Sequence, residues 1–412
     1  MLTNDVILAL VKIVLLVGGL MTAVGYGVLL ERWVAAWVQD RLGPNRVGIP
    51  LTDIRLFGLG QPLADGVKFI LKEDFTPGHV DARLFNLAPI CILAAALAVF
   101  AVVPFGSITP PVEWGGDAKP IELVVAPGMD IGLIYVFALS SVAVYGVILG
   151  GWSSNNKYSF LGGLRSSAQL IAYELPLGLG ILGVVLASGS LRLEDIITRQ
   201  AESGVWFAFS QPLGFVVFVI AAFAEAARLP FDLPEAEQEL VGGYHTEYAG
   251  TKLLNFLAAE YLHMILAGFM ITIVFLGGWH FWGITGSEDN VTWLGAILRI
   301  LVLTAKIFAL VFFFMMVRWS WPRFRFDQLM SLAWTVMLPL GLANLVVVAV
   351  VQELTHKSVL GPDKAERLGP WLAIAAGWAV FVVGWAIAAY CAPLQTDNRP
   401  RMGRPYEVDP QV

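Results

Sequence analysis

The sequence predicts an all-α polytopic membrane protein, and three observations support that fold class. The chain has 412 residues, of which 57% are hydrophobic and 14% are charged, whereas soluble domains carry about 25% charged residues. Apolar runs recur along it, each long enough for an α-helix to cross about 30 Å of hydrocarbon. The first run has no basic segment before it and continues for about 25 residues, so we expect a span there and no cleavable signal peptide.

The apolar runs predict eight transmembrane helices in a core and a ninth near the C-terminus. We assign residues 1–352 to the core and residues 353–412 to an extension that holds the ninth helix and a tail. Cys91 and Cys391 lie in separate apolar runs, so neither a disulfide framework nor a four-ligand metal site is predicted. The expected spans are 6–30, 84–104, 129–151, 169–189, 206–227, 253–283, 294–317, 331–352 and 371–392.

The positive charges predict how the chain is oriented in its membrane. The loops that follow odd-numbered spans contain 17 Lys and Arg residues, and the other loops contain 6. Cytoplasmic loops carry the excess of Lys and Arg, so we expect the N-terminus outside and the most conspicuous loops and the C-terminal tail in the cytoplasm. The net charge of −6 gives no indication of nucleic-acid binding.

The loop after the first span begins with charged residues and a rigid turn. Glu31 and Arg32 end the span, and RLGPNRVG is a Gly-Pro turn that presents Arg41 and Arg46. Such a turn holds a fixed shape while it offers cations to a ligand. The alternative is that these arginines anchor the loop to lipid phosphate.

An amphipathic helix is expected farther along the same loop. Residues 61–73 place Leu and other apolar side chains on one side and Asp65, Lys68 and Lys72 on the other. A helix of this kind lies at the headgroup level of the membrane. It could form the lip of an opening for an amphipathic substrate, or it could pack peripherally without that role.

The segment 225–247, EAARLPFDLPEAEQELVGGYHTE, is unusually acidic for a position between two spans. Carboxylates near a low dielectric are costly unless they are paired or protonated, so they commonly mark a polar pathway. Pro230 and Pro234 bracket a turn, and a short helix after Pro234 would place Glu235 and Glu239 on one face. An ordered cluster of like charges predicts coupled proton affinities, whereas a solvated acidic loop is the alternative. The carboxylates are Glu225, Asp232, Glu235, Glu237, Glu239 and Glu247.

Three further charges lie within predicted spans, namely Glu174, Glu260 and Lys306. Ionisable residues inside a membrane are more often functional than structural, although a buried ion pair that fixes helix register is the alternative. With Glu225 they predict a polar line that leads inward from the acidic segment. His245 belongs to that segment and titrates near neutral pH. The other histidines, His79, His263, His280 and His356, are predicted to be ordinary hydrogen-bonded residues.

Two long motifs carry a family resemblance. The first joins Glu31 and Arg32 to RLGPNRVG and QPLADGVK, and the second is PFDLPEAEQELVGGYHTEYAG, residues 230–250. Shorter blocks are GWSSNNKYS, LRSSAQLIAYE, AEY and VRWSWPRFRFDQLM. Together they resemble the H subunit of the bacterial proton-pumping NADH:quinone oxidoreductase, respiratory complex I, over residues 1 to about 350.

The resemblance implies a protein that has no redox centre of its own, with FMN and iron–sulfur clusters held by partner subunits. It implies a plasma-membrane location, menaquinone or ubiquinone as substrate, and a quinone chamber shared with peripheral-arm subunits, one of which carries the terminal cluster. Small membrane subunits and antiporter-like subunits are the other implied partners. The predicted chamber and channel residues are Glu31, Arg32, Arg41, Arg46, Asp65, Arg228, Phe256 and Tyr261. The predicted proton relay is Glu174, Glu225, Asp232, Glu235, Glu237, Glu239, Glu247 and Glu260, to which we add Lys306.

The sequence departs from the family pattern in two places. Thr335 follows Trp334 where the family tends to keep a Lys, and the chain continues to a ninth span. Two other functions remain as alternatives. A membrane subunit of an energy-converting hydrogenase would need no quinone, and the intact RLGPNRVG motif and amphipathic helix disfavour it. A stand-alone ion carrier would predict inverted repeats, which we do not find in the sequence.

Overall fold

Long helices dominate the computed structural model, which confirms the all-α polytopic fold. Eight described helices are long and apolar enough to cross a membrane. A hairpin of two short strands, β1 (Val112–Trp114) and β2 (Asp117–Lys119), is the sheet in the described part of the chain. The structure describes residues 2–48, 55–114, 117–232, 241–282, 284–285, 292–355 and 362–395.

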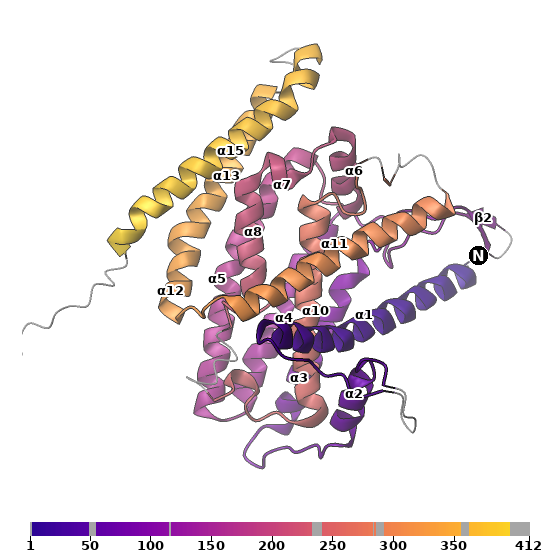
Figure 1. Ribbon diagram of the computed structural model, residues 1–412, viewed down its shortest axis with the longest axis vertical. Coiled ribbons are helices and arrows are strands. Elements are labelled where there is room, and N and C mark those ends of the chain that lie inside the picture. Colours follow the sequence, from indigo (N-terminus) through magenta and orange to yellow (C-terminus); the bar gives the residue numbers. More distant parts are fainter. Residues whose placement is uncertain are drawn as a thin grey trace, which may run out of the picture.

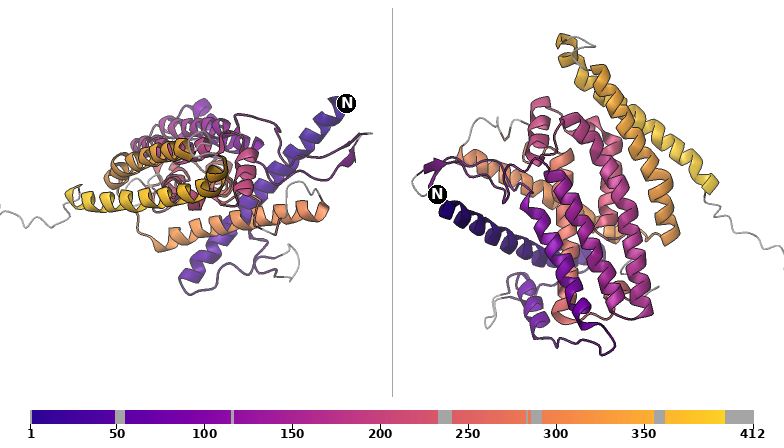
Figure 2. Two further views of the ribbon diagram at one scale, coloured as in Figure 1. Left: turned by 90° about the horizontal axis from the view of Figure 1, so that it is seen from above. Right: turned by 180° about the vertical axis from the view of Figure 1, so that it is seen from behind.

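One helix, α10, forms the centre of the helical bundle. Its apolar window is 89% buried, the highest value among the candidate spans, and it packs against α3, α8 and α11. In Figures 1 and 2, α1 and α11 lean away from the bundle on the same side, and α13 and α15 run together along the edge of the molecule. The helices are α1 (Leu2–Val38), α2 (Gln61–Leu71), α3 (Ala82–Ala98), η1 (Val99–Ala101), α4 (Gly132–Ser153), α5 (Lys157–Ser188), α6 (Leu193–Ser203), α7 (Phe207–Ser210), α8 (Pro212–Glu225), η2 (Gly243–His245), α10 (Gly250–Phe275), α11 (Trp293–Ser320), α12 (Phe326–Ser331), η3 (Leu332–Met337), α13 (Leu338–Thr355) and α15 (Pro362–Gln395).

Small residues let the core helices approach one another closely. A Cβ atom on Gly146 of α4 would lie 2.7 Å from the Cβ of Ile92 on α3, and one on Gly151 would lie 2.8 Å from the carbonyl oxygen of Ser159 on α5. Both distances are shorter than side-chain contacts allow. Membrane helices have no hydrophobic driving force between them, so close backbone packing of this kind is what holds them together.

Several helices differ in length from the predicted spans. The first helix continues to Val38, so Glu31 and Arg32 lie inside it instead of at its end. The fourth begins at Lys157, where the Asn156 side chain accepts a hydrogen bond from the Tyr158 amide, so Glu174 lies near the middle of a helix of 32 residues. The sixth ends at Phe275, eight residues early. Gly277 and Gly278, with φ of 73° and 54°, reverse the chain there, because only glycine adopts that region without strain.

The fifth expected span, 206–227, is shorter than predicted. Its apolar residues form α7 and α8, and Pro212 begins the second helix. The 14 residues of α8 rise about 21 Å, which is less than the roughly 30 Å of a hydrocarbon core. The described residues up to Thr355 therefore include seven long apolar helices and the shorter α8. The ninth expected helix, α15, is long and apolar as predicted, and it packs against α13.

Candidate functional site

A large apolar groove lies between α1, α10 and α11. Its volume is about 740 Å³, and most of its lining is aliphatic or aromatic, including Leu16, Met264 and Phe308. Lys12 of α1 also lines the groove and donates a hydrogen bond to the Val124 carbonyl at 3.0 Å. Tyr261 from α10 lines it as well. A cavity of this size and polarity suits an amphiphile with a long hydrocarbon tail.

Tyr261 connects the groove to a buried charged cluster around Glu31. The Tyr261 hydroxyl and the Arg228 Nη1 atom both donate to Glu31 Oε2, the latter at 3.3 Å, and Arg318 donates to Oε1. Glu31 is 6% exposed and Arg228 is 5% exposed. The Arg228 guanidinium also stacks 4.2 Å above the Tyr261 ring centroid. We call these four residues, Glu31, Arg228, Tyr261 and Arg318, the Glu31 cluster.

Four separate elements build the Glu31 cluster. Glu31 comes from α1, Arg228 from the turn after α8, Tyr261 from α10, and Arg318 from the last turn of α11. A cation at a helix C-terminus is favoured by the helix dipole, which explains why Arg318 is tolerated at the end of an apolar helix. Charge-assisted hydrogen bonds from three donors stabilise the Glu31 carboxylate in a site from which water is largely excluded.

Arg32 points to a different partner, because neighbouring helix residues face different directions. Its Nη1 atom lies 2.7 Å from Asp65 Oδ2 on α2, and Lys68 Nζ lies 3.3 Å from Asp65 Oδ1. Burial alone would raise the pKa of Asp65, but the adjacent Arg32 and Lys68 cations together hold that pKa below its usual value. The pair joins α2 to α1. The α2 helix leaves its apolar side exposed, with Ile70 70% and Leu71 78% exposed, as an interfacial helix requires.

The RLGPNRVG turn packs onto the end of α1. The Trp33 indole nitrogen donates to the Pro44 carbonyl at 2.9 Å, and a Cβ atom on Gly43 would lie 2.5 Å from a Trp33 ring carbon. Glycine is therefore required at position 43. Arg41 and Arg46 are exposed, and Arg41 donates to the Gln39 side chain at 2.7 Å. Neither arginine belongs to the Glu31 cluster.

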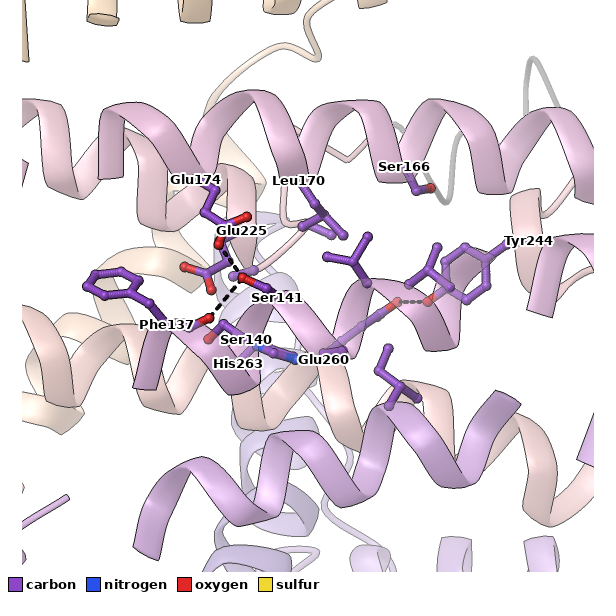
Figure 3. Close-up of a pocket in the computed structure, with 16 residues that line it drawn as sticks. Phe137, Ser140, Ser141, Ser166, Leu170, Glu174, Glu225, Tyr244, Glu260 and His263 are labelled. Carbon is purple, nitrogen blue, oxygen red and sulfur yellow. Dashed lines mark hydrogen bonds between the residues drawn. The ribbon is translucent and has the colours of Figure 1, made fainter. Parts of the chain in front are cut away.

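A second, smaller cavity of about 50 Å³ lies among α4, α5, α8 and α10, and three of the predicted relay residues line it. Glu174 accepts a hydrogen bond from Ser141, and Glu225 is hydrogen-bonded to Ser140. Tyr244 donates to Glu260 Oε1 at 2.9 Å. Figure 3 shows Glu174, Glu225 and the two serines together at one end of this acidic cavity, with Glu260 reaching toward Tyr244 at the other. His263 also lines it.

Three other predicted residues have well-defined partners but do not themselves line the groove or the acidic cavity. Glu247 accepts from Asn156 Nδ2 at 2.6 Å, at the corner between α4 and α5. Asp232, which is 3% exposed, accepts from Arg323 Nη2 at 3.4 Å. Phe256 is buried, and its ring packs at 5.2 Å from that of Tyr244.

Lys306 lies at the far end of α10 from the Glu31 cluster. Its ammonium donates to the carbonyls of Leu276, Gly278 and His280, at 2.6, 2.9 and 2.7 Å. It also lies 4.6 Å above the ring of Trp206. Lys306 thus satisfies carbonyl groups where α10 ends, and the structure does not bring it into the acidic cavity.

Part of the acidic segment lies outside the described residues. Pro234, Glu235, Glu237 and Glu239 fall in the range 233–240, and His356 lies in 356–361. Within the described ranges, no group of three or more His, Cys, Asp or Glu residues is arranged to hold a metal ion.

Comparison with known proteins decides the family. A family model described as NADH dehydrogenase matches residues 11–349. The NADH-quinone oxidoreductase H subunit numbered 1 of Geobacter metallireducens is 46% identical over 343 residues, which cover 83% of this chain and 96% of the relative. The H subunit numbered 2 of Koribacter versatilis and the H subunit of Bacillus cytotoxicus are each 44% identical, over 83% of this chain and 96% and 93% of the relatives. The chain belongs to the family of NADH-quinone oxidoreductase H subunits. It is therefore a multi-pass membrane component of an oxidoreductase complex, respiratory complex I, and it works with other subunits of that complex.

The structure also adds residues to the site of this complex I subunit that the sequence motifs did not identify. Arg318, Ser141 and Tyr244 contact predicted site residues directly. Arg318 lies in the block VRWSWPRFRFDQLM, and the basic residues of that block are the sequence feature that could have identified Arg318 as a site residue. His263 is the clearest omission, because it follows Glu260 by three residues and so shares a helix face with it.

Proposed function

We propose that this subunit forms the channel by which a quinone enters the complex, and part of the chamber in which the quinone is reduced. We further propose that it couples reduction to proton pumping through the acidic cavity. The observation that carries the proposal is the apolar groove, about 740 Å³ in volume, whose lining residue Tyr261 also bonds to the buried Glu31 cluster.

A quinone has two chemical parts, and the site matches both. Its isoprenoid tail is apolar, so the aliphatic and aromatic lining between α1, α10 and α11 can hold it without burying unpaired polar groups. Its head carries two carbonyl oxygens that accept hydrogen bonds. The Tyr261 hydroxyl and the guanidinium groups of Arg228 and Arg318 are donors near the polar end of the groove. Guanidinium groups also stabilise the negative charge that develops when the head is reduced.

The acidic cavity supplies groups that can carry protons in response. Glu174, Glu225 and Glu260 come from three different helices and line one small cavity. We propose that Asp232 and Glu247, with Glu235, Glu237 and Glu239 outside the described residues, continue this line to the cytoplasmic face. Arg41 and Arg46 are exposed in the isolated subunit, and in this proposal peripheral-arm subunits cover them in the complex. Those subunits hold the FMN and the iron–sulfur clusters that supply electrons.

The location and domain organisation follow from the same proposal. We propose the bacterial plasma membrane, with the N-terminus outside and the C-terminal tail cytoplasmic. Residues 1–352 form the core, and residues 353–412 form an extension that lies beyond the residues matched by the family model. A hydrogenase-type subunit binds no quinone and so requires no groove that fits a hydrocarbon tail. The groove therefore favours the quinone function.

The test is to fill the groove with a side chain. Gly19 lines the groove, and no atom lies within 4 Å of the place its Cβ would take, so Gly19→Phe projects a ring into the groove without a clash. The ring occupies space that the quinone tail would fill, and side-chain volume in excess of the available space costs about 1–3 kcal/mol, which corresponds to a rise of roughly 5- to 150-fold in the quinone KM. NADH oxidation by a soluble acceptor should be unchanged, because the partner subunits are intact.

Gly18→Phe is the matched control. Gly18 also has no atom within 4 Å of its Cβ position, and it lies outside the residues that line the groove. Both substitutions replace a glycine of the same helix, so their effects on helix stability are equal. Equal quinone KM values for Gly19→Phe, Gly18→Phe and the unaltered complex would refute a quinone channel in this groove.

A further inference from the structure

We propose that His263 connects Glu225 to Glu260 through hydrogen-bonded water, and so completes the proton line in the acidic cavity. The inference rests on the proposed function, since it names a residue of that line which the sequence motifs do not include. Three observations support it: the position of His263, its unpartnered ring nitrogen, and the space around it.

His263 stands where two cavities meet. It lines the acidic cavity of about 50 Å³, together with Glu174, Glu225 and Glu260. It also lines a smaller cavity of about 20 Å³, and Glu225 and Ser140 line both as well. His263 follows Glu260 by three residues on α10, so both side chains project from the same face of that helix. Figure 3 shows the imidazole next to Ser140 and the stem of Glu260.

The imidazole has a buried nitrogen without a protein partner. His263 Nδ1 has no hydrogen-bond partner within the described part of the chain. Buried side-chain polar atoms nearly always have a partner, either protein or ordered water. Within the described residues, His263 Nδ1 therefore lacks the protein hydrogen bond that a fully bonded buried histidine would make. Water in the adjoining cavities is the partner that remains.

The cavities have the room and the polar groups that water requires. A bound water needs at least about 10–15 Å³ of such volume and two to four polar partners, and both cavities exceed that minimum, so each has room for water. The titratable groups around this water are Glu174 from α5, Glu225 from α8, Glu260 and His263 from α10, and Tyr244. Ser140 and Ser141 add hydroxyl groups from α4.

A neutral imidazole suits this position because it offers one donor and one acceptor. A water bonded to Nδ1 can bond to a carboxyl group as well, so protons can pass between Glu225 and Glu260 along the water. The imidazole orders the water and need not itself become charged. His263 is thus a positioning residue for the proton line.

The experiment compares three variants of the assembled complex in proteoliposomes, with quinone-dependent NADH oxidation and proton pumping as readouts. His263→Leu removes the hydrogen bonds at similar size, and we expect both activities to fall at least about tenfold, since positioned proton transfer contributes about 10²–10⁴-fold. His263→Asn places an amide atom where Nδ1 lies, but it cannot titrate in this range. We expect His263→Asn to retain at least about half of both activities. Native gels confirm that each variant has assembled, and oxidation of NADH by a soluble acceptor confirms that the partner subunits are active.

Each other outcome contradicts a specific part of the argument. Full activity of His263→Leu would show that the imidazole is dispensable. Loss of activity in both His263→Leu and His263→Asn would show that the ring itself must titrate or pack, which overturns the water bridge. Glu225→Gln separates the inference from the proposed function. If Glu225→Gln pumps normally, the proton line fails and the inference fails with it. If Glu225→Gln is inactive while His263→Leu is normal, only the inference fails.

Discussion

Replacing Glu31 with Gln should destabilise the protein far more than the same change at Asp65. Both carboxylates accept hydrogen bonds from an arginine, and both substitutions keep the size of the side chain while removing its charge. Glu31 is 6% exposed and has three donors, from Arg228, Tyr261 and Arg318. Glu31→Gln leaves two guanidinium groups facing a neutral amide in a buried site.

The expected magnitudes follow from burial. Breaking a buried ion pair by removing one partner costs about 3–5 kcal/mol. The unfolding entropy of globular chains is about 2.1 cal/mol/K per residue, or about 0.9 kcal/mol/K for a chain of this length, so the thermal midpoint should fall by roughly 3–6 °C. The Asp65 pair differs, because the Arg32 side chain is 40% exposed. A surface pair is worth about 0–1 kcal/mol, so Asp65→Asn should lower the midpoint by about 1 °C or less.

The assay is thermal dissociation of the purified complex in detergent, followed on native gels and by loss of quinone reductase activity. Asp65→Asn is the matched control, because it also removes a carboxylate that binds an arginine. That arginine, Arg32, directly follows Glu31 in the chain. Equal midpoints for Glu31→Gln and Asp65→Asn would show that Glu31 is solvated in the assembled enzyme. The account of the Glu31 cluster would then be refuted.

Two further variants test residues of the predicted relay. Lys306→Met removes the donor to three carbonyls at the end of α10. Hydrogen bonds to a charged group contribute about 1.5–3 kcal/mol, so the thermal midpoint should fall by about 2–3 °C. Proton pumping per assembled complex should persist. Lost pumping at an unchanged midpoint would instead support Lys306 as a relay residue. Glu235→Gln with Glu237→Gln should preserve assembly and lower quinone reduction and proton transport together, measured in vesicles. Normal pumping by that assembled double variant would mean that the segment is a solvated loop, where Gln is tolerated within about 0.5 kcal/mol.

The sequence predicted the helices better than it predicted their ends. Hydropathy identifies a span because about 20 apolar residues must cross the hydrocarbon, but it does not indicate at which residue the helix ends. Glu31 shows the consequence. The apolar run ends before it, whereas the helix continues to Val38, because tertiary contacts satisfy the charge inside the helix. At the sixth span the error is reversed, since Gly277 and Gly278 end the helix within an apolar sequence.

The candidate site was predicted as a set of residues but not as an arrangement. Glu31 meets Arg228, Tyr261 and Arg318 across 197, 230 and 287 positions of the chain. No local spacing encodes contacts of that range, so only a family motif could suggest them. Glu31 and Arg32 also separate, because consecutive helix residues point about 100° apart. One joins the buried cluster and the other joins α2.

The same helical geometry supplies a physical basis for the proposed coupling. On α10, Tyr261, Met264 and Ile265 line the groove, whereas Glu260 and His263 line the acidic cavity. One helix, about 10 Å across with its side chains, is therefore the wall between the two. A unit charge that appears on one side of that wall acts on a charge 10 Å away with about 1.7 kcal/mol at an effective dielectric constant of 20, against about 0.4 kcal/mol in water. The buried position of α10 keeps water out of the intervening space. Under the proposed function, quinone reduction beside Tyr261 would therefore change the protonation of the acidic cavity by more than tenfold, without any movement of the helix that separates them.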